Sequence, residues 1–130
     1  VEAHGLHPRG RVVMSAVAGA EPVIMLTAPG PASAKCLERA GMTVDDIDLW
    51  EINEAFASVT LQSIRELGIE EDRVNVNGGA VALGHPIGAS GARIRGVLVY
   101  ELRRRGGGLG VAAICSGGGQ GDAVILRVHG

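Results

Sequence analysis

The sequence predicts an α/β fold, a layered sheet with its elements in the order β-α-β-α-β-α-β-β, and three observations predict it. Apolar segments rich in Val and Ala alternate with segments whose apolar residues recur at helical spacing. The last two apolar segments flank a glycine-rich turn, which is typical of an antiparallel hairpin. The 130 residues are 46% hydrophobic and 2% aromatic, so we expect one domain over residues 1–130 with an aliphatic core.

The first strand is predicted over residues 11–18, where Val and Ala follow no helical stripe, and a turn is predicted over 19–22. A cluster of Pro and Gly at 27–31 comes next. It precedes a short helix with apolar residues at helical spacing, and Gly41 is the expected stop of that helix.

Thr43 and Asp46 have the spacing of a capping arrangement at a helix start, and a short strand is predicted over 47–52. Asn53 is a good N-cap for the helix that follows, which is expected to end at Gly68. The apolar face of that helix is predicted to hold Phe56, Val59, Ile64 and Leu67.

The second half of the chain begins with a brief strand over 73–77 and a close-packed turn over 78–84. An apolar stripe then predicts a helix over 89–105, which Gly106 closes. The final hairpin is predicted to consist of strands over 110–116 and 123–128 around a tight glycine turn at 117–121.

Charge and composition exclude several classes of function. The net charge of -2 and the pI near 6.1 lack the basic excess that nucleic acid binding requires, so no nucleic acid partner is expected. No apolar run approaches the ~20 residues that span a bilayer, so no membrane association is expected. Cys36 and Cys115 lie far apart without a C-x-x-C motif, which excludes a disulfide framework and a zinc ribbon. The histidines at positions 4, 7, 85 and 129 form no metal-ligand pattern.

Three polar stretches begin where a predicted strand or turn ends. They cover residues 53–57, 84–91 and 115–121. In open α/β sheets, ligands bind beyond the carboxyl ends of the strands, so the three stretches are expected to converge on one pocket although they are far apart in sequence.

Each candidate residue also has an ordinary structural interpretation. A loop histidine such as His85 is more often a structural residue, but Gly84 and Pro86 fix its backbone, and a rigid imidazole suits a general base or an oxyanion donor. Cys115 could be a small buried hydrophobe, yet the glycines after it would present backbone N–H groups near the sulfur. Asn53 suits an N-cap without any further function.

Three motifs, taken together, resemble the C-terminal half of the thiolases, the acyl-CoA acetyltransferases. They are Asn-Glu-Ala-Phe-Ala at 53–57, Asn-Val-Asn-Gly-Gly-Ala at 75–80 running into Gly-His-Pro-Ile-Gly-Ala-Ser-Gly at 84–91, and Cys-x-Gly-Gly-Gly-Gln-Gly at 115–121. The resemblance extends from about residue 11 to residue 128, with the motifs in order and in register.

The resemblance implies a five-stranded mixed sheet flanked by helices, which in the family packs against a similar N-terminal half. It implies interconversion of a 3-oxoacyl-CoA plus CoA with acetyl-CoA plus a shortened acyl-CoA. CoA and acyl-CoA are then substrates, and no cofactor, metal or redox group is expected. The expected partners are the N-terminal thiolase half and further copies of the protein in a homo-oligomer, and the expected location is the cytoplasm, or an organelle matrix in a eukaryote.

The resemblance also implies roles for five residues. His85 matches the histidine that activates the nucleophilic thiol and contributes to an oxyanion hole for the thioester enolate. Asn53 matches the asparagine that holds a water in that hole, and Cys115 matches the second cysteine, which moves a proton at the substrate α-carbon or the leaving thiol. The Gly117 N–H matches a donor to the acyl-enzyme oxyanion, and Phe56 is expected to line the pantetheine end.

One departure from the family pattern bears on activity. The acylated cysteine of the family lies in the N-terminal half, in a motif that these 130 residues do not contain, and Cys36 is interpreted as core packing. We therefore expect a fragment that is inactive alone. The alternative is a non-catalytic, thiolase-like module that binds a partner chain or a CoA ester, and the joint presence of Asn53, His85 and Cys115 disfavours it. A ketosynthase-type condensing enzyme is disfavoured because such enzymes usually carry His at the position of Cys115.

Overall fold

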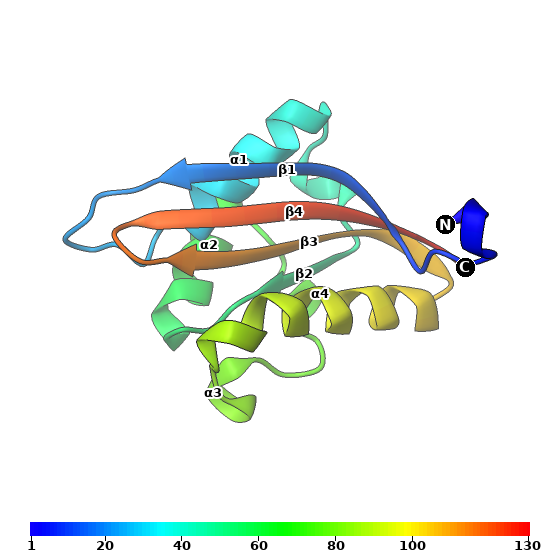
Figure 1. Ribbon diagram of the computed structural model, residues 1–130. Coiled ribbons are helices and arrows are strands. Elements are labelled where there is room, and N and C mark those ends of the chain that lie inside the picture. The colour runs from blue at the N-terminus through cyan, green and yellow to red at the C-terminus, as the bar shows by residue number, and fades with distance from the viewer.

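A four-stranded mixed sheet forms the middle layer of the protein in a computed structural model that describes all residues 1–130 (Figure 1). The strand order is β1-β4-β3-β2. Their bounds are β1 Arg11–Gly19, β2 Leu49–Ile52, β3 Gly107–Ser116 and β4 Gln120–His129. The β3–β4 hairpin and the β1–β4 pair are antiparallel, whereas β2 pairs with β3 in parallel. The predicted hairpin and the mixed α/β sheet are thereby confirmed.

Four α-helices accompany the sheet, and the long ones cover its two faces. They are α1 Pro29–Ala40, α2 Ala57–Leu67, α3 Ala80–Leu83 and α4 Ile87–Arg104. Helix α1 packs against β1 and β4 with α2 beside it, while α4 lies on the opposite face across β3 and β2 (Figure 1). No helix combines the length and the apolarity needed to cross a membrane.

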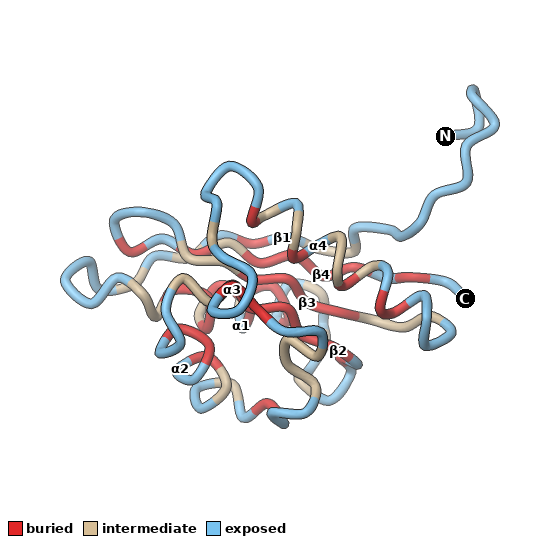
Figure 2. Tube along the Cα trace, turned by 90° about the horizontal axis from the view of Figure 1, so that it is seen from below, coloured by how far each residue is buried: buried red, intermediate tan, exposed pale blue.

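The core has one apolar cluster on each face of the sheet, and the buried stretches gather in its strands (Figure 2). Trp50, Val111 and the fully buried Cys36 belong to the cluster beneath α1, which confirms Cys36 as a packing residue. Leu98 of α4 belongs to the other cluster. A Cβ at Gly110 would lie 2.6 Å from the Leu98 side chain, so the glycine allows α4 to approach β3 closely.

The predicted strand over 73–77 is wrong, and the sheet has four strands where five were expected. Only an isolated parallel bridge joins Trp50 to Val74. Asn75 has a φ of 48°, which takes the backbone out of the extended region, and its side chain occupies the edge of β2 instead. Its Oδ1 accepts a hydrogen bond from the Ile52 N–H at 2.9 Å, and its Nδ2 donates to the Ile52 carbonyl at 2.9 Å. The segment thus bonds β2 through a single backbone hydrogen bond, from the Asn75 N–H to the Trp50 carbonyl, and through the Asn75 side chain, and no fifth strand forms.

The start of the second long helix also differs from its prediction. Helix α2 begins at Ala57 with Phe56 at the N-cap position, so Asn53 is not its N-cap. The Asn53 N–H instead donates to the Ala113 carbonyl at 2.9 Å and continues the ladder of β2. Phe56 is 63% exposed, rather than on the buried face, because it precedes the first turn of α2. The buried face of α2 is formed by Val59, Thr60 and Ser63.

Smaller differences concern the ends of elements. The predicted turn over 78–84 contains the single-turn helix α3. Helix α4 begins at Ile87, directly after Pro86, and β3 begins at Gly107, directly after the end of the predicted helix. The capping arrangement of Thr43 and Asp46 is confirmed, since the Thr43 N–H donates to Asp46 Oδ2 at 2.8 Å.

Candidate active site

Asn53 stands at the carboxyl end of β2 and is completely buried. Its backbone is fixed by the bond to the Ala113 carbonyl of β3, and its own carbonyl accepts the Ala55 N–H at 3.0 Å. The amide side chain therefore projects from a rigid strand end. This is the edge at which the parallel strands of an α/β sheet place their ligands.

His85 lies in the short loop between α3 and α4, and its ring is held against Asn53. Gly84 has a φ of 91°, a value that favours glycine, and it turns the chain into this loop. His85 Nδ1 lies 2.6 Å from the Ser90 hydroxyl, and the two ring nitrogens lie 3.4 and 3.5 Å from Asn53 Nδ2. The fold thus brings together two residues that are 32 positions apart.

Two charged side chains lie next to Asn53, and the sequence analysis missed both. Arg93 of α4 donates to Asn53 Oδ1 at 3.1 Å. Glu51 of β2 is 2% exposed, and burial raises its pKa to about 7, although the Arg93 charge lowers it and the Glu54 charge adds to the rise. The sequence signal was the spacing: Glu51 lies two residues before Asn53 on the same strand face, and Arg93 lies three residues after Ser90 on the same helix face.

Glu54 links the Asn53 loop to α3. Its carboxylate accepts hydrogen bonds from Asn75 Nδ2 at 2.8 Å and from the Val81 N–H at 2.9 Å. Glu54 therefore binds the N-terminal turn of α3 and not that of α2, the helix that follows it in sequence. Gly79 lies against this carboxylate, and a Cβ there would collide with it.

Cys115 is half-buried near the carboxyl end of β3, paired with Gly121 of β4. Burial raises the pKa of its thiol, while a hydrogen bond from its own backbone lowers it, with a net rise. Because strand side chains alternate, Cys115 shares the α1 side of the sheet with Val111 and Ala113, whereas the Asn53 amide reaches His85 on the α4 side. No hydrogen bond joins the thiol to the other two side chains, so these groups can face a common ligand only beyond the strand ends.

Gly117 and Phe56 also border this edge of the sheet. Gly117 opens the β3–β4 turn, in which Gly118 and Gly119 have φ values of 75° and 81°. Phe56 is exposed beside a shallow pocket of about 310 Å³ that Glu54 and other residues line. No contact in the structure tests the roles of Gly117 or Phe56, which stay predictions.

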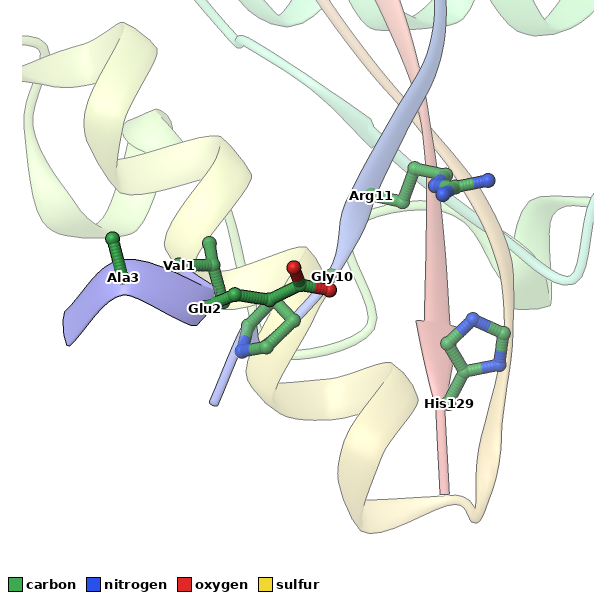
Figure 3. A pocket seen from close by; sticks show the side chains of 7 residues that line it. Val1, Glu2, Ala3, Gly10, Arg11 and His129 are labelled. Carbon is green, nitrogen blue, oxygen red and sulfur yellow. The ribbon is translucent and has the colours of Figure 1, made fainter. Parts of the chain in front are cut away.

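The largest of the main pockets lies at the other end of the sheet. It has a volume of about 770 Å³ and is formed by residues 1–3 together with Arg11 and His129 (Figure 3). Arg11 begins β1 and His129 pairs with Gly107 at the start of β3, so this pocket is remote from the carboxyl ends of β2 and β3. None of the main pockets is lined by Asn53, His85 or Cys115. The single pocket expected for the three groups is therefore not formed by these side chains alone.

Comparisons with known proteins agree with the resemblance that the motifs indicate. The family model described as "Thiolase, C-terminal domain" matches residues 6–128. An acetyl-CoA acetyltransferase of Allochromatium vinosum is 53% identical over 123 residues, which are 95% of this chain and 31% of that protein. A 3-ketoacyl-CoA thiolase of Marinobacter nauticus is 50% identical over 127 residues, with 95% of this chain and 32% of the relative covered.

Solved structures agree with these relatives. The crystal structure of human mitochondrial 3-ketoacyl-CoA thiolase superimposes with a TM-score of 0.96 at 48% identity, covering 100% of this chain and 33% of that one. A second crystal structure of the same human protein, in complex with CoA, gives the same values. The chain thus spans about a third of the length of the relatives it matches. With a family match over residues 6–128, the chain belongs to the thiolase family and carries its C-terminal domain.

Proposed function

We propose that this domain supplies the acid–base and oxyanion-stabilising groups of a thiolase reaction. In that reaction CoA cleaves a 3-oxoacyl-CoA to acetyl-CoA and a shortened acyl-CoA, or the reverse condensation takes place. The nucleophilic cysteine would come from an N-terminal thiolase half. The observation that carries the proposal is the meeting of Asn53 with His85 at the carboxyl end of β2.

The proposed roles follow from what each group can do chemically. Cleavage expels the acetyl-CoA enolate, whose negative charge develops on the thioester oxygen. Fixed donors at that oxygen lower the barrier, and each one typically contributes ~3 kcal/mol. In this proposal His85 first takes the proton of the nucleophilic thiol and then donates to the enolate oxygen, while Asn53 holds a water that donates to the same oxygen.

Cys115 is proposed to move the proton at the α-carbon. Its raised pKa keeps the thiol protonated at neutral pH, which suits protonation of the enolate carbon in the cleavage direction. The Gly117 N–H is proposed as a donor to the acyl-enzyme oxyanion, and Phe56 as part of the wall around the pantetheine chain. The exposure of Phe56 is compatible with such a wall.

The proposed partners are CoA and acyl-CoA, an N-terminal thiolase half and further copies of the intact protein. A relative of known structure was crystallised in complex with CoA, which supports the choice of ligand. The proposed reaction transfers an acyl group without net oxidation, so it requires no redox cofactor. We propose a cytoplasmic location, or an organelle matrix in a eukaryote.

A chimera tests the proposal. This chain would replace the matching segment of the Allochromatium vinosum relative, and CoA-dependent cleavage of acetoacetyl-CoA would be measured. We expect the chimera to be active, its His85→Ala variant to lose at least about 100-fold in kcat, and the 130-residue chain alone to be inactive. A folded chimera that is no faster than its His85→Ala variant would support the non-catalytic module instead.

A further inference from the structure

Four side chains form one continuous series of hydrogen bonds that ends at a backbone carbonyl. Arg93 Nη2 lies 3.1 Å from Asn53 Oδ1, and Asn53 Nδ2 lies 3.5 Å from His85 Nε2. His85 Nδ1 lies 2.6 Å from the Ser90 hydroxyl, which lies 3.2 Å from the Pro86 carbonyl. Asn53 Nδ2 is also 3.4 Å from His85 Nδ1, but the much shorter contact with Ser90 engages that nitrogen.

The groups in this series differ in whether they can exchange the roles of hydrogen-bond donor and acceptor. An amide, a neutral imidazole and a hydroxyl can each donate and accept, so Asn53, His85 and Ser90 permit either direction. The two ends permit only one, because a guanidinium can only donate and a carbonyl can only accept. Arg93 therefore requires the amide oxygen of Asn53 to face it, which turns the amide N–H towards the ring. At the other end, Ser90 donates to Pro86 and accepts from His85 Nδ1.

We propose that Arg93 is a positioning residue, which acts through Asn53 to hold His85 in the tautomer with its proton on Nδ1 and with Nε2 unprotonated, where Nε2 accepts only the long 3.5 Å contact from Asn53 Nδ2. Ser90 enforces the same tautomer from the opposite side of the ring. The lone pair on Nε2 is what a base for a neighbouring thiol needs. This last consequence rests on the proposed function, whereas the tautomer itself does not.

The guanidinium of Arg93 makes one hydrogen bond to a side chain, the bond to Asn53 Oδ1. Its Nε and Nη1 are buried without hydrogen-bond partners, and so is Oε2 of the nearby Glu51. Asn53 and Ser90 are both completely buried, and low-dielectric surroundings strengthen their hydrogen bonds. The ionised form of the Glu51 carboxyl carries the charge opposite to that of Arg93, and the attraction between them lowers the pKa of Glu51 against the larger effect of burial. The direction of the series is therefore set by charged and backbone groups that cannot turn over.

The tautomer can be read from two-bond ¹H–¹⁵N NMR correlations of the His85 ring, at a pH at which the ring is neutral. We expect a protonated Nδ1 and an unprotonated Nε2, with about a tenfold or greater excess of this form. In Arg93→Met the amide is free to turn over, and the excess should fall to within about threefold of equal populations. Arg93→Lys should restore the excess, because an ammonium also only donates. Arg95→Met, which removes an exposed arginine of the same helix, is the matched control and should change nothing.

Two results would overturn the proposal: a wild-type ring protonated on Nε2, or an unchanged tautomer in Arg93→Met. If Arg93→Met does not fold, Ser90→Ala gives the second measurement, since it removes the acceptor of the Nδ1 proton and should also reduce the excess. An unchanged tautomer in folded Ser90→Ala would then overturn the proposal.

In the active chimera, Arg93→Met should lower kcat by about 10- to 100-fold while KM changes by less than about threefold. If Arg93→Met loses the tautomer but keeps the kcat of the chimera, the positioning of His85 has no effect on catalysis. That result would overturn the proposed catalytic consequence. An inactive chimera with the expected tautomer would count against the proposed function alone.

Discussion

At the scale of single residues, the site contains groups that can both donate and accept a hydrogen bond, and groups that can do only one of these and so fix the orientation of the others. The Asn53 amide and the His85 ring each permit two arrangements, whereas Arg93 and the Pro86 carbonyl permit one each. Cys115 lies on a neighbouring strand end without a contact to either, which suits a role in a separate proton transfer. Two predictions belong to this scale.

Replacement of Cys115 by Ala in the chimera should separate two steps of the proposed reaction. Exchange of the α-protons of acetyl-CoA with solvent deuterium should be nearly abolished, because the group that carries this proton is gone. Acylation of the nucleophilic cysteine should remain measurable by mass spectrometry. The conservative variant Cys115→Ser is the control for packing and should acylate equally well. Equal loss of exchange and acylation in both variants would contradict a role in proton transfer.

Glu51 should make stability depend on pH in a defined window. Its folded pKa is raised from 4.5 to about 7, chiefly by burial, with Arg93 lowering it and Glu54 raising it further. The folded state therefore binds this proton more tightly than the unfolded state. The stability that the protonated form contributes is complete below pH 4.5 and is lost as the pH rises to about 7.

Urea unfolding of wild type and Glu51→Gln across this range provides the measurement. The glutamine cannot ionise, so the stability of the variant relative to wild type should grow between pH 4.5 and about 7 and then level off. The exposed Glu38→Gln serves as the control and should follow the wild-type curve. Parallel curves for wild type and Glu51→Gln would show that Glu51 titrates normally.

At the scale of elements, polar side chains replace backbone at the edge of β2. The Asn75 amide binds both the N–H and the carbonyl of Ile52, and its Nδ2 also binds Glu54. Glu54 in turn binds the first turn of α3, which leads into the His85 loop. The position of His85 thus depends on the side-chain contacts of Asn75 and Glu54 at the edge of β2. A regular fifth strand would have occupied this edge.

Asn75→Ala should therefore destabilise the protein by about 2–4 kcal/mol, because buried polar groups of Ile52 lose their partners and a left-handed φ is imposed on alanine. Asn75→Gly retains the favourable φ and loses only the hydrogen bonds, so it should be less destabilised than Asn75→Ala. Chemical denaturation of the two variants beside wild type checks both values. A loss below about 0.5 kcal/mol for Asn75→Gly would show that the amide contributes little to the sheet edge.

At the scale of the whole molecule, one face of the sheet is covered incompletely. Helix α4 covers β2 and β3, but the α4 side of β1 remains exposed, with Val12 at 62% and Val17 at 52% exposure. A shallow apolar groove runs beside these residues over β4. Strand β1 is also an edge strand, so its outer backbone groups are unpaired.

The chain alone should consequently self-associate as its concentration rises, and sedimentation equilibrium measures this. Val17→Lys places a charge on the exposed face of the edge strand and should shift the chain towards monomer. Val81→Lys, at a valine of α3 that is 69% exposed, is the control and should leave the association unchanged. A wild-type chain that remains monomeric at high concentration would show that this face needs no cover.

The sequence by itself determined the fold class, the final hairpin and the order of the long helices and the four strands, because hydrophobic periodicity and glycine turns are local properties. It also determined the family, through three motifs between residues 53 and 121, and the family model matches residues 6–128. Only the tertiary structure decided that Asn53 continues β2, that the Asn75 side chain binds the edge of β2, and that Arg93 reaches the amide beside His85. Each of these features depends on a hydrogen bond between residues that are distant in sequence. Such partners cannot be predicted from a local pattern of residues, because that pattern describes only neighbours along the chain.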